Sequence, residues 1–431
     1  MSHWRCCCGG GCPVQGNHLV VGGVFTHLAT GTEAMHIAAW GYDPEGIPRW
    51  SHLQGLNGDV HAVASVGGVL YVGGSFTASI AEPGRPSVPL NRLAQWDCDR
   101  WKPVGQGTGG GVDDTVYVLK KKRAGITTPE VLLIGGNFTQ NAVGVPLART
   151  AAYSPASGPG GPIYQDFAVA PGGTVRSIGF RDFPGDFEDP DFQIGRGVVG
   201  GPFFTPSQSV ATGVGPFVTT TGSGANSMVL AALHRFVGGD PGLSVEEVIL
   251  GGGFTVAGGV QTRRFGKWRS TGGGNFVKQS LLGFVNGAVQ ALHWSPFRNA
   301  VLIGGSFTAR EDGPSMNYFA SSPQGGQDPV GHGFGINNAV QAICEFEGEV
   351  IIGGAFTSPS GRVGRLIGAS TWAPLSADDP GVTGGPVQAL CEHDFGAQSR
   401  AEAARGRIAR ALNRTGGGLR APRPRGQRGR A

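Results

Sequence analysis

The chain has 431 residues, of which 78 are glycine and 29 are proline, and each glycine inside a helix costs about 1 kcal/mol, which excludes a mainly helical protein. Hydrophobic residues make up 39% of the chain, with 23 Phe and 8 Trp, so the body is not disordered, and the glycines do not recur at every third position as collagen requires. The net charge is only +4, and the class that remains is an all-β protein punctuated by glycine.

The N-terminal segment, residues 1–11, is rich in cysteine and lacks the apolar stretch of a secretory signal. The cysteines of the chain are Cys6, Cys7, Cys8, Cys12, Cys98, Cys344 and Cys391. Zinc sites usually use cysteines separated by a short spacer, so the three adjacent cysteines favour a disordered terminus, with a metal site and a lipid-modified end as alternatives. The cysteines do not indicate the redox compartment.

An internal repeat begins near residue 19 and organises the chain. An apolar run is followed by Gly-Gly-x-Phe-Thr, and the first glycine of the pair falls at residues 22, 73, 135, 200, 251, 304 and 353. The copies are 49 to 65 residues apart, and the copy at 198–205 carries one inserted residue. Seven units of this size predict an all-β fold, a seven-bladed β-propeller whose blades are four-stranded antiparallel sheets.

A second motif, Val-x-Ala-Leu or a close variant, precedes every glycine pair except the first. It stands at 60–63, 116–119, 175–178, 289–292, 340–343 and 387–390, with a blurred copy near 228–233. Apolar residues alternate with other residues over its four positions, which is the period of a strand. Aromatic segments between the units, such as 37–40 and 93–96, complete the four short strands of each blade.

The two ends of the repeat array are incomplete in complementary ways. The first Gly-Gly strand, at 18–26, has no Val-x-Ala-Leu strand before it, and the last Val-x-Ala-Leu strand, at 387–391, has no Gly-Gly strand after it. Pairing these segments would leave no open sheet edge. We therefore predict that the propeller is closed by pairing of its N- and C-terminal strands and spans residues 12–395.

The repeated residues have structural roles that need no ligand. Adjacent glycines allow a strand to pass where a Cβ would collide, the phenylalanine contributes about 2 kcal/mol by burial, and the threonine favours an extended backbone and can tie a turn with its hydroxyl. We predict that the phenylalanines belong to the core and do not form a stacking platform. The structural repeat residues are Gly22, Gly23, Phe25, Gly73, Gly74, Phe76, Gly135, Gly136, Phe138, Gly251, Gly252, Phe254, Gly304, Gly305, Phe307, Gly353, Gly354 and Phe356.

These units resemble the glycine-rich propeller repeats of kelch and galactose-oxidase-like proteins. They are more similar to the Gly-Gly-x-Phe-Thr repeats of bacterial surface proteins, to delta-60 repeats and to the repeats of fungal cortical polarity markers. The resemblance covers residues 19–390 and is specific for the architecture. It implies binding, adhesion or scaffolding, often at a cell surface, and transfers no catalytic residue. The chain departs from the kelch pattern because Phe-Thr follows the glycines and the tyrosines and tryptophans are not regularly spaced.

The sequence contains no motif that indicates catalysis. Two Gly-x-Gly-x-x-Gly matches, at 105–110 and 195–200, are expected by chance at this glycine content, and neither opens a helix. Phosphate-binding loops, nucleophile elbows and the paired histidines of zinc enzymes are absent. We predict that the chain is not an enzyme and has no catalytic residues and no cofactor, with small hydroxyl and backbone groups at the mouth of the central channel.

An acidic stretch lies in the longest interval between glycine pairs. Its five carboxylates are those of Asp182, Asp186, Glu188, Asp189 and Asp191. Calcium takes about six to eight oxygen ligands, so these residues are a candidate calcium site, although their spacing is not that of an EF-hand. The simpler interpretation is a solvated inserted loop.

The C-terminal segment, residues 396–431, is basic. Residues 400–431 hold ten arginines and one acid, Glu402, and carry +9, whereas residues 1–399, with 24 basic and 29 acidic residues, carry −5. We expect this segment to be mostly disordered. It either contacts nucleic acid or an anionic surface through its arginines or is a terminus without function.

The sequence predicts a non-catalytic binding or structural scaffold, whose unknown protein or glycan partner meets loops at one face of the propeller. Its longest variable segments are 120–123, which is basic, and 182–191, which is acidic. The alternative is a propeller enzyme, galactose-oxidase-like or a hydrolase, that acts on carbohydrate at the channel mouth. We expect a monomer with no transmembrane segment, because no run of 18 apolar residues occurs. Only the family resemblance suggests a cell-surface or extracellular location.

Overall fold

The computed structural model describes residues 16–43, 45–97, 100–122, 130–158, 160–164, 173–180, 197–200, 210–212, 225–237, 245–257, 260–272, 275–278, 285–311, 313–324, 328–376 and 380–395. Strands form most of the regular structure in these ranges, together with a 3₁₀ helix, η1 (Pro155–Ser157). The all-β class predicted from the glycine content is therefore correct.

Four-stranded antiparallel sheets recur along the chain. One sheet has the order β5 (Val60–Val66), β6 (Val69–Gly74), β7 (Leu93–Asp97), β8 (Arg100–Pro103). Another has the order β9 (Val116–Lys122), β10 (Val131–Gly136), β11 (Thr150–Tyr153), β12 (Ile163–Tyr164). A third has the order β16 (Val229–Val237), β17 (Val245–Gly252), β20 (Phe265–Gly272), β21 (Asn275–Lys278). The next are β22 (Val289–Ser295), β23 (Ala300–Gly305), β24 (Phe319–Pro323), β25 (Val330–Gly331); and β26 (Val340–Phe346), β27 (Glu349–Gly354), β28 (Val363–Ile367), β29 (Thr371–Ala373). A further sheet has the order β31 (Val387–Asp394), β1 (Asn17–Gly23), β3 (Ile37–Tyr42), β4 (Pro48–His52). Small two-stranded ladders pair β2 (His27–Leu28) with β30 (Val382–Thr383) and β18 (Val256–Ala257) with β19 (Val260–Gln261).

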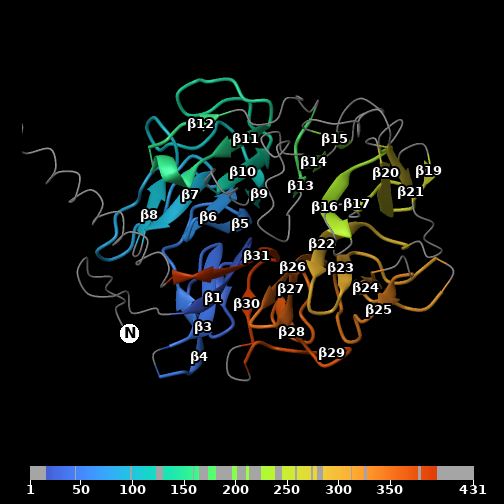
Figure 1. Cartoon of the computed structure of the whole chain (residues 1–431). Helices are drawn as coiled ribbons and strands as arrows, with labels where there is room; N and C mark the ends of the chain where they lie inside the picture. The colour runs from blue at the N-terminus through green and yellow to red at the C-terminus, as the bar shows by residue number, and fades with distance from the viewer. Residues whose placement is uncertain are drawn as a thin grey trace, which may run out of the picture.

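The sheets stand around a common centre, each with one edge strand innermost (Figure 1). The inner strands are β5, β9, β13 (Ser177–Phe180), β16, β22, β26 and β31, and each contacts the next in this order, with β31 also contacting β5. The inner strands contain or overlap the Val-x-Ala-Leu motifs, and the Gly-Gly strands lie second. This arrangement is a β-propeller built of four-stranded antiparallel blades.

The number of complete blades differs from the prediction. The sequence predicted seven four-stranded blades, whereas the described residues form six four-stranded sheets and one three-stranded sheet, β13, β14 (Gly197–Gly200) and β15 (Val210–Thr212). The Gly-Gly strand of this sheet is the degenerate copy, in which Pro202 follows the glycines. Proline has no N–H to donate to a ladder, so this copy departs from the repeat just where the others continue into Phe-Thr.

The two ends of the described chain meet in one sheet. β31 lies antiparallel to β1, from Asn17 opposite Asp394 to Gly23 opposite Val387. The pairing predicted between these segments is therefore present. β1 also pairs with β3, so one C-terminal inner strand completes a sheet of three N-terminal strands. The ladder of β2 with β30 joins the same two parts of the chain.

The phenylalanine of the repeat lies in the core. Phe25, Phe76, Phe138, Phe254, Phe307 and Phe356 are all 0% exposed. Phe76, for example, belongs to a buried cluster with Leu56, Val60 and Leu90. These side chains are therefore not available as a stacking platform for a ligand.

The two glycines of each pair are needed for different reasons. In six copies of the pair, a Cβ on the first glycine would lie 2.4 to 2.7 Å from Cγ1 of a valine on, or just before, the inner strand of the next sheet, as Gly73 does with Val116. A Cβ on the second would lie 1.9 to 2.2 Å from a carbonyl oxygen beside the inner strand of its own sheet, as Gly74 does with Asp59. The pair thus lets one strand approach both its own inner strand and the neighbouring blade.

Candidate binding site

A β-bulge recurs near the start of the inner strands. In β5 the pairing passes from Val60 opposite Gly74 to Ala62 opposite Gly73, which leaves His61 without a partner in the ladder. The same shift occurs in the five other four-stranded sheets. Because a bulge redirects the side chain of its extra residue, the variable residue of Val-x-Ala is released from the alternation of the strand.

We call the residues at this position the central ring. The set includes Arg176, which holds the same place in the segment Val175-Arg-Ser-Ile178. Every member is half-buried and follows a fully buried valine. The members are His61, Tyr117, Arg176, Leu230, Gln290, Gln341 and Gln388.

Four successive members of the central ring touch one another. Gln388 Oε1 lies 2.5 Å from His61 Nδ1, and the rings of His61 and Tyr117 have centroids 5.0 Å apart at an angle of 36°. The guanidinium carbon of Arg176 lies 3.5 Å from the centre of the Tyr117 ring. These contacts cross from β31 to β5, β9 and the segment before β13, so they link four neighbouring sheets.

The surroundings of His61 favour its neutral imidazole. Burial lowers its pKa, Arg176 and His36 lower it further, and the hydrogen bond with Gln388 and the charge of Asp59 oppose the change. An amide oxygen can only accept a hydrogen bond, so His61 Nδ1 donates to Gln388. The other ring nitrogen, Nε2, is therefore left as an acceptor.

Several polar atoms of the central ring have no partner within the described part of the chain. Nε of Arg176 and Oε1 of both Gln290 and Gln341 are buried and form no hydrogen bond. No described carboxylate forms an ion pair with Arg176. A buried polar group without a partner costs about 1–3 kcal/mol, so the ring carries groups that a ligand can satisfy.

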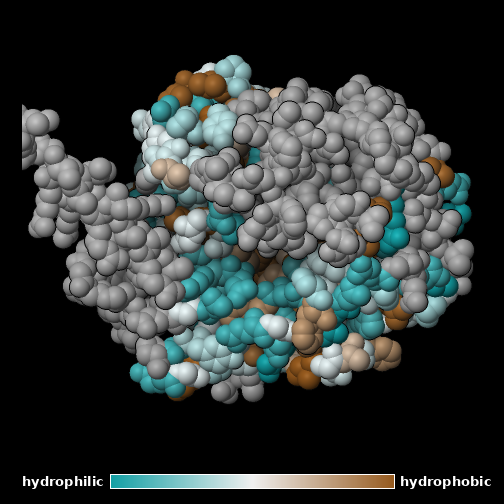
Figure 2. All heavy atoms as spheres, viewed as in Figure 1, coloured by the Kyte–Doolittle hydropathy of each residue, from teal (hydrophilic) through white to brown (hydrophobic). Residues whose placement is uncertain are grey.

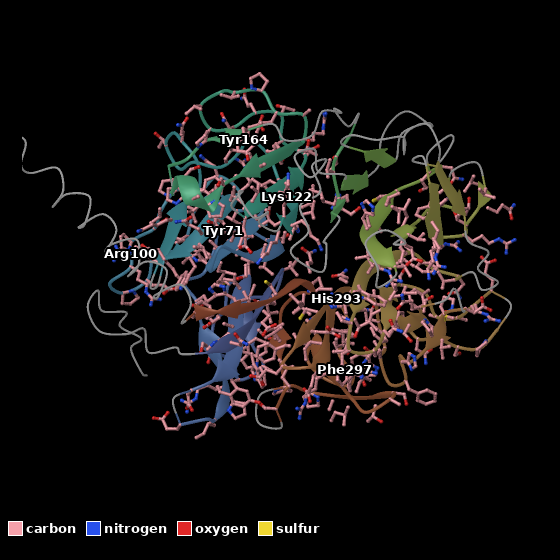
Figure 3. All side chains as sticks on the ribbon, viewed as in Figure 1. Tyr71, Arg100, Lys122, Tyr164, His293 and Phe297 are labelled. Atoms are coloured by element: carbon pink, nitrogen blue, oxygen red, sulfur yellow. The ribbon has the colours of Figure 1, made fainter. Side chains whose placement is uncertain are left out.

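A second set of polar contacts joins the inner strands further along their length. Glu345 of β26 accepts a hydrogen bond from Ser295 of β22 and lies 3.8 Å from Nε2 of His293. His293, which lies near the centre of the molecule in Figure 3, lowers the pKa of the Glu345 carboxyl. Ser65 Oγ lies 2.9 Å from Nδ1 of His393 on β31. Hydrophilic residues accordingly gather around the centre of the face seen in Figure 2.

A buried charge cluster lies between the sheet of β16 and the sheet of β22. The carboxylate of Glu247, 0% exposed, lies 2.8 Å from Nε of Arg235 and 2.9 Å from Nε of Arg269. Lys267, also 0% exposed, lies 4.0 Å from the same carboxylate, and burial lowers the pKa of its amine. Arg235 stacks on Trp294 of β22 at 3.7 Å. The cluster joins two blades, so its role is structural.

A repeated turn holds the Phe-Thr segment of five sheets. In each, the side-chain oxygen of an Asn or Asp accepts the backbone N–H groups of the repeat threonine and the next residue, and the side chain also bonds the threonine hydroxyl. These pairs are Asn57 with Thr77, Asp113 with Thr139, Asn226 with Thr255, Asn286 with Thr308, and Asn337 with Thr357. In the sheet that joins the ends, Gly384 takes the Asn position and Thr26 bonds His27 instead.

The centre differs from its prediction. The sequence predicted small hydroxyl and backbone groups at the channel mouth, but the structure brings together Gln388, His61, Tyr117 and Arg176. The prediction failed because of the β-bulge. A bulge redirects one side chain of an inner strand, and no short sequence motif predicts it. The turn of Asn or Asp with Thr was also missed, although an Asn or Asp three residues before the inner valine is visible in five units.

The other predicted sites divide into two groups. The calcium hypothesis at 182–191, the cysteines at 6–12, Cys98 and the basic tail lie outside the described residues. The basic segment 120–123 was predicted as a variable loop, but Lys120, Lys121 and Lys122 belong to strand β9, because they pair with β10. In the ranges that the structure covers, no three His, Cys, Asp or Glu side chains are placed to hold a metal ion.

Comparison with known proteins identifies no family and finds similarity to a solved structure. Neither a family model nor a curated protein matches the chain. Among solved structures the chain is similar to the WD40 β-propeller domain of Doa1, with a TM-score of 0.42 and 11% identity, over 82% of this chain and 97% of that chain. The resemblance to kelch and Gly-Gly-x-Phe-Thr repeat proteins stays a prediction. Within the described ranges, no helix is long and apolar enough to cross a membrane.

Proposed function

We propose that the chain is a non-catalytic binding scaffold, a ring of seven repeat units closed by the pairing of β1 with β31, and that its partner is a protein or a glycan that reaches the central ring. The observation that carries this proposal is the set of buried, unpartnered polar atoms on Arg176, Gln290 and Gln341. The chain presents these atoms at one repeated backbone position, so a ligand can engage several blades at once.

The Asn–Thr turns support a role in binding. They hold the Phe-Thr segments of five sheets with two backbone and one side-chain hydrogen bond each, as in the pair of Asn286 with Thr308. Such ties fix the loops beside the inner strands before a partner arrives. A preorganised surface loses less conformational entropy on binding.

The alternative function is catalysis on a carbohydrate at the centre. It is favoured by the contact of three side chains that can donate or accept protons or carry charge, His61, Tyr117 and Arg176. Glycoside hydrolysis, however, mostly uses two carboxylates about 5 to 10 Å apart, and the central ring contains none. The composition of the ring therefore supports binding better than hydrolysis.

The test measures binding and turnover with the same full-length chain. A panel of glycans and of unstructured peptides is titrated, and hydrolysis and oxidation of the same glycans are followed in parallel. Saturable binding without turnover, weakened by Gln341→Leu and not by the surface substitution Asn338→Ala, is the expected result. Turnover of a glycan that His61→Ala abolishes would overturn the proposal in favour of the enzyme.

A further inference from the structure

The central ring offers an unpaired cation. Arg176 stacks on Tyr117 at 3.5 Å and forms no ion pair with any described carboxylate. Its Nε is buried and has no hydrogen-bond partner. By contrast, the half-buried Arg365 on β28 bonds both Glu349 and the carbonyl of Pro374. A guanidinium keeps its charge at any physiological pH, so Arg176 holds a positive charge at the centre, with no counter-charge among the carboxylates that the structure describes.

The remaining groups of the ring include both donors and acceptors. Gln290, Gln341 and Gln388 carry amide N–H₂ groups, which donate, and Tyr117 carries a hydroxyl that can donate. The side-chain oxygen of Gln388 accepts the hydrogen bond from His61, so its N–H₂ group can donate to another partner. The open acceptors of the ring are Nε2 of His61 and the unpartnered Oε1 atoms of Gln290 and Gln341, so the charge and the unpartnered Nε–H of Arg176 are the features that favour an acceptor ligand.

The stacking geometry disfavours a sugar at Tyr117. Sugar rings bind aromatic side chains by covering a free face, and the Arg176 guanidinium already covers a face of Tyr117, with His61 packed 5.0 Å away. A carboxylate needs no aromatic face and pairs with a guanidinium through two parallel hydrogen bonds. Asp59, whose charge acts on His61, lies with its carboxylate 3.5 Å from Nδ1 of His36 and forms no ion pair with Arg176.

We propose that the central ring is a carboxylate-binding site in which Arg176 pairs with the carboxylate and the hydroxyl of Tyr117, on whose ring Arg176 stacks, donates to it. The inference rests on the proposed function, and it names the ligand chemistry of the same site. The carboxylate belongs either to a small organic acid or to an acidic peptide segment of a partner, and both sources present the same group to Arg176.

A pH dependence follows from the position of His61. In the free protein burial, Arg176 and His36 lower the His61 pKa, while Gln388 and Asp59 raise it, and the ring of Tyr117 packs against the imidazole. A bound carboxylate pairs with Arg176 and attracts the imidazolium, so the His61 pKa is higher in the complex. Binding therefore takes up a proton. The affinity is highest at acidic pH and falls as the pH rises through the His61 pKa of the complex.

The experiment is calorimetric titration of the full-length chain with succinate, with an acetylated Asp-Glu peptide and with the same peptide amidated on both side chains. The first two probes are expected to bind and the amidated peptide is not. Arg176→Gln should weaken binding about 10- to 100-fold, because the charge-assisted pair is lost. The matched control Arg365→Gln should change it less than twofold.

The outcomes separate this inference from the proposed function. If neither carboxylate probe binds, or if Arg176→Gln and Arg365→Gln weaken binding equally, the carboxylate site is wrong even where glycans or neutral peptides bind the scaffold. If Arg176→Gln does not fold, Arg176→Lys keeps the charge and loses the paired geometry, and unchanged affinity in that variant overturns the pairing. The proposed uptake of a proton by His61 is contradicted if the wild-type affinity does not vary between pH 5.5 and 8, or if the affinity of His61→Gln varies with pH to the same extent.

Discussion

At the scale of the residue, the glycine pair can be separated into its two functions. The unit at 251–253 has three consecutive glycines, which supplies a matched comparison. A Cβ on Gly252 would lie 2.1 Å from the carbonyl oxygen of Met228, whereas a Cβ on Gly253 would meet nothing closer than 3.6 Å. The close contact is with backbone, which cannot rotate away as a side chain can.

We therefore predict that Gly252→Ala destabilises the fold and that Gly253→Ala does not. Forcing a methyl group against the backbone costs about 1–3 kcal/mol or more, and an alanine accommodated without strain stabilises by about 0.4–1 kcal/mol through the unfolded chain. Urea unfolding of the two variants measures both effects. Equal stability of the variants would show that the glycine pair is not kept for close packing.

The buried charge cluster gives a second prediction for a single residue. Glu247 is the carboxylate paired with Arg235, Arg269 and Lys267, so Glu247→Gln leaves three cations at the blade interface without a counter-charge. Removing one partner of a buried pair costs about 3–5 kcal/mol. The control is Glu349→Gln, whose ion pair with Arg365 is half-exposed, and a surface pair contributes about 0–1 kcal/mol. A thermal unfolding midpoint lowered equally by both variants would contradict the structural role of the cluster.

At the scale of the element, the Asn–Thr turns are units that one side chain can disrupt. Asn337 bonds the Thr357 hydroxyl at 2.9 Å and accepts N–H groups from Thr357 at 2.8 Å and Ser358 at 3.2 Å. Its exposed neighbour Asn338 bonds only the adjacent Ala339 N–H. We predict that Asn337→Ala lowers the free energy of unfolding by about 1–2 kcal/mol and speeds amide exchange at Thr357 and Ser358.

The same measurements on Asn338→Ala serve as the control. That variant is expected to unfold within about 0.5 kcal/mol of the wild type, as surface substitutions usually do. Faster exchange at Thr357 in Asn338→Ala, or unchanged exchange in Asn337→Ala, would show that the turn does not hold the Phe-Thr segment.

The strands could be predicted from the sequence because packing at fixed positions restricts their residues. Each glycine pair marks the end of a second strand, as Gly73 and Gly74 end β6, and Val60 marks an inner strand that lies against a glycine pair of the preceding blade. The central ring could not be predicted, because packing does not restrict the bulged position, which accepts His, Tyr, Arg, Leu or Gln. Only the fold brings His61 against Gln388, which lies 327 residues away.

At the scale of the whole molecule, the pairing of β1 with β31 decides whether the units form one ring. Val20 lies opposite Cys391 in this ladder, and both side chains belong to the same apolar cluster. Directly opposed residues of an antiparallel pair have Cα atoms about 4.5–5.5 Å apart, which lies within the range that a disulfide spans. A cysteine at position 20 can therefore report the pairing covalently.

We predict that Val20→Cys forms a disulfide with Cys391 on oxidation with copper phenanthroline. The bond would close nearly the whole chain into a loop and raise the free energy of unfolding by about 6 kcal/mol in the chain-entropy description. Burial raises the pKa of Cys391 to about 12, so the reaction is expected to take hours at pH 8.5. Mass spectrometry of the non-reduced digest identifies the cross-linked peptide.

The matched control is Val21→Cys. Val21 lies opposite Leu390 and its side chain points to the other face of the sheet, so it should not cross-link to Cys391 under the same conditions. Selective cross-linking at position 20 would establish both the pairing of the strands and its register, and with them a ring that joins the first and last repeat units. Equal cross-linking of the two variants would indicate a mobile contact, and no cross-linking of either would place the ends apart and leave β1 as an open edge.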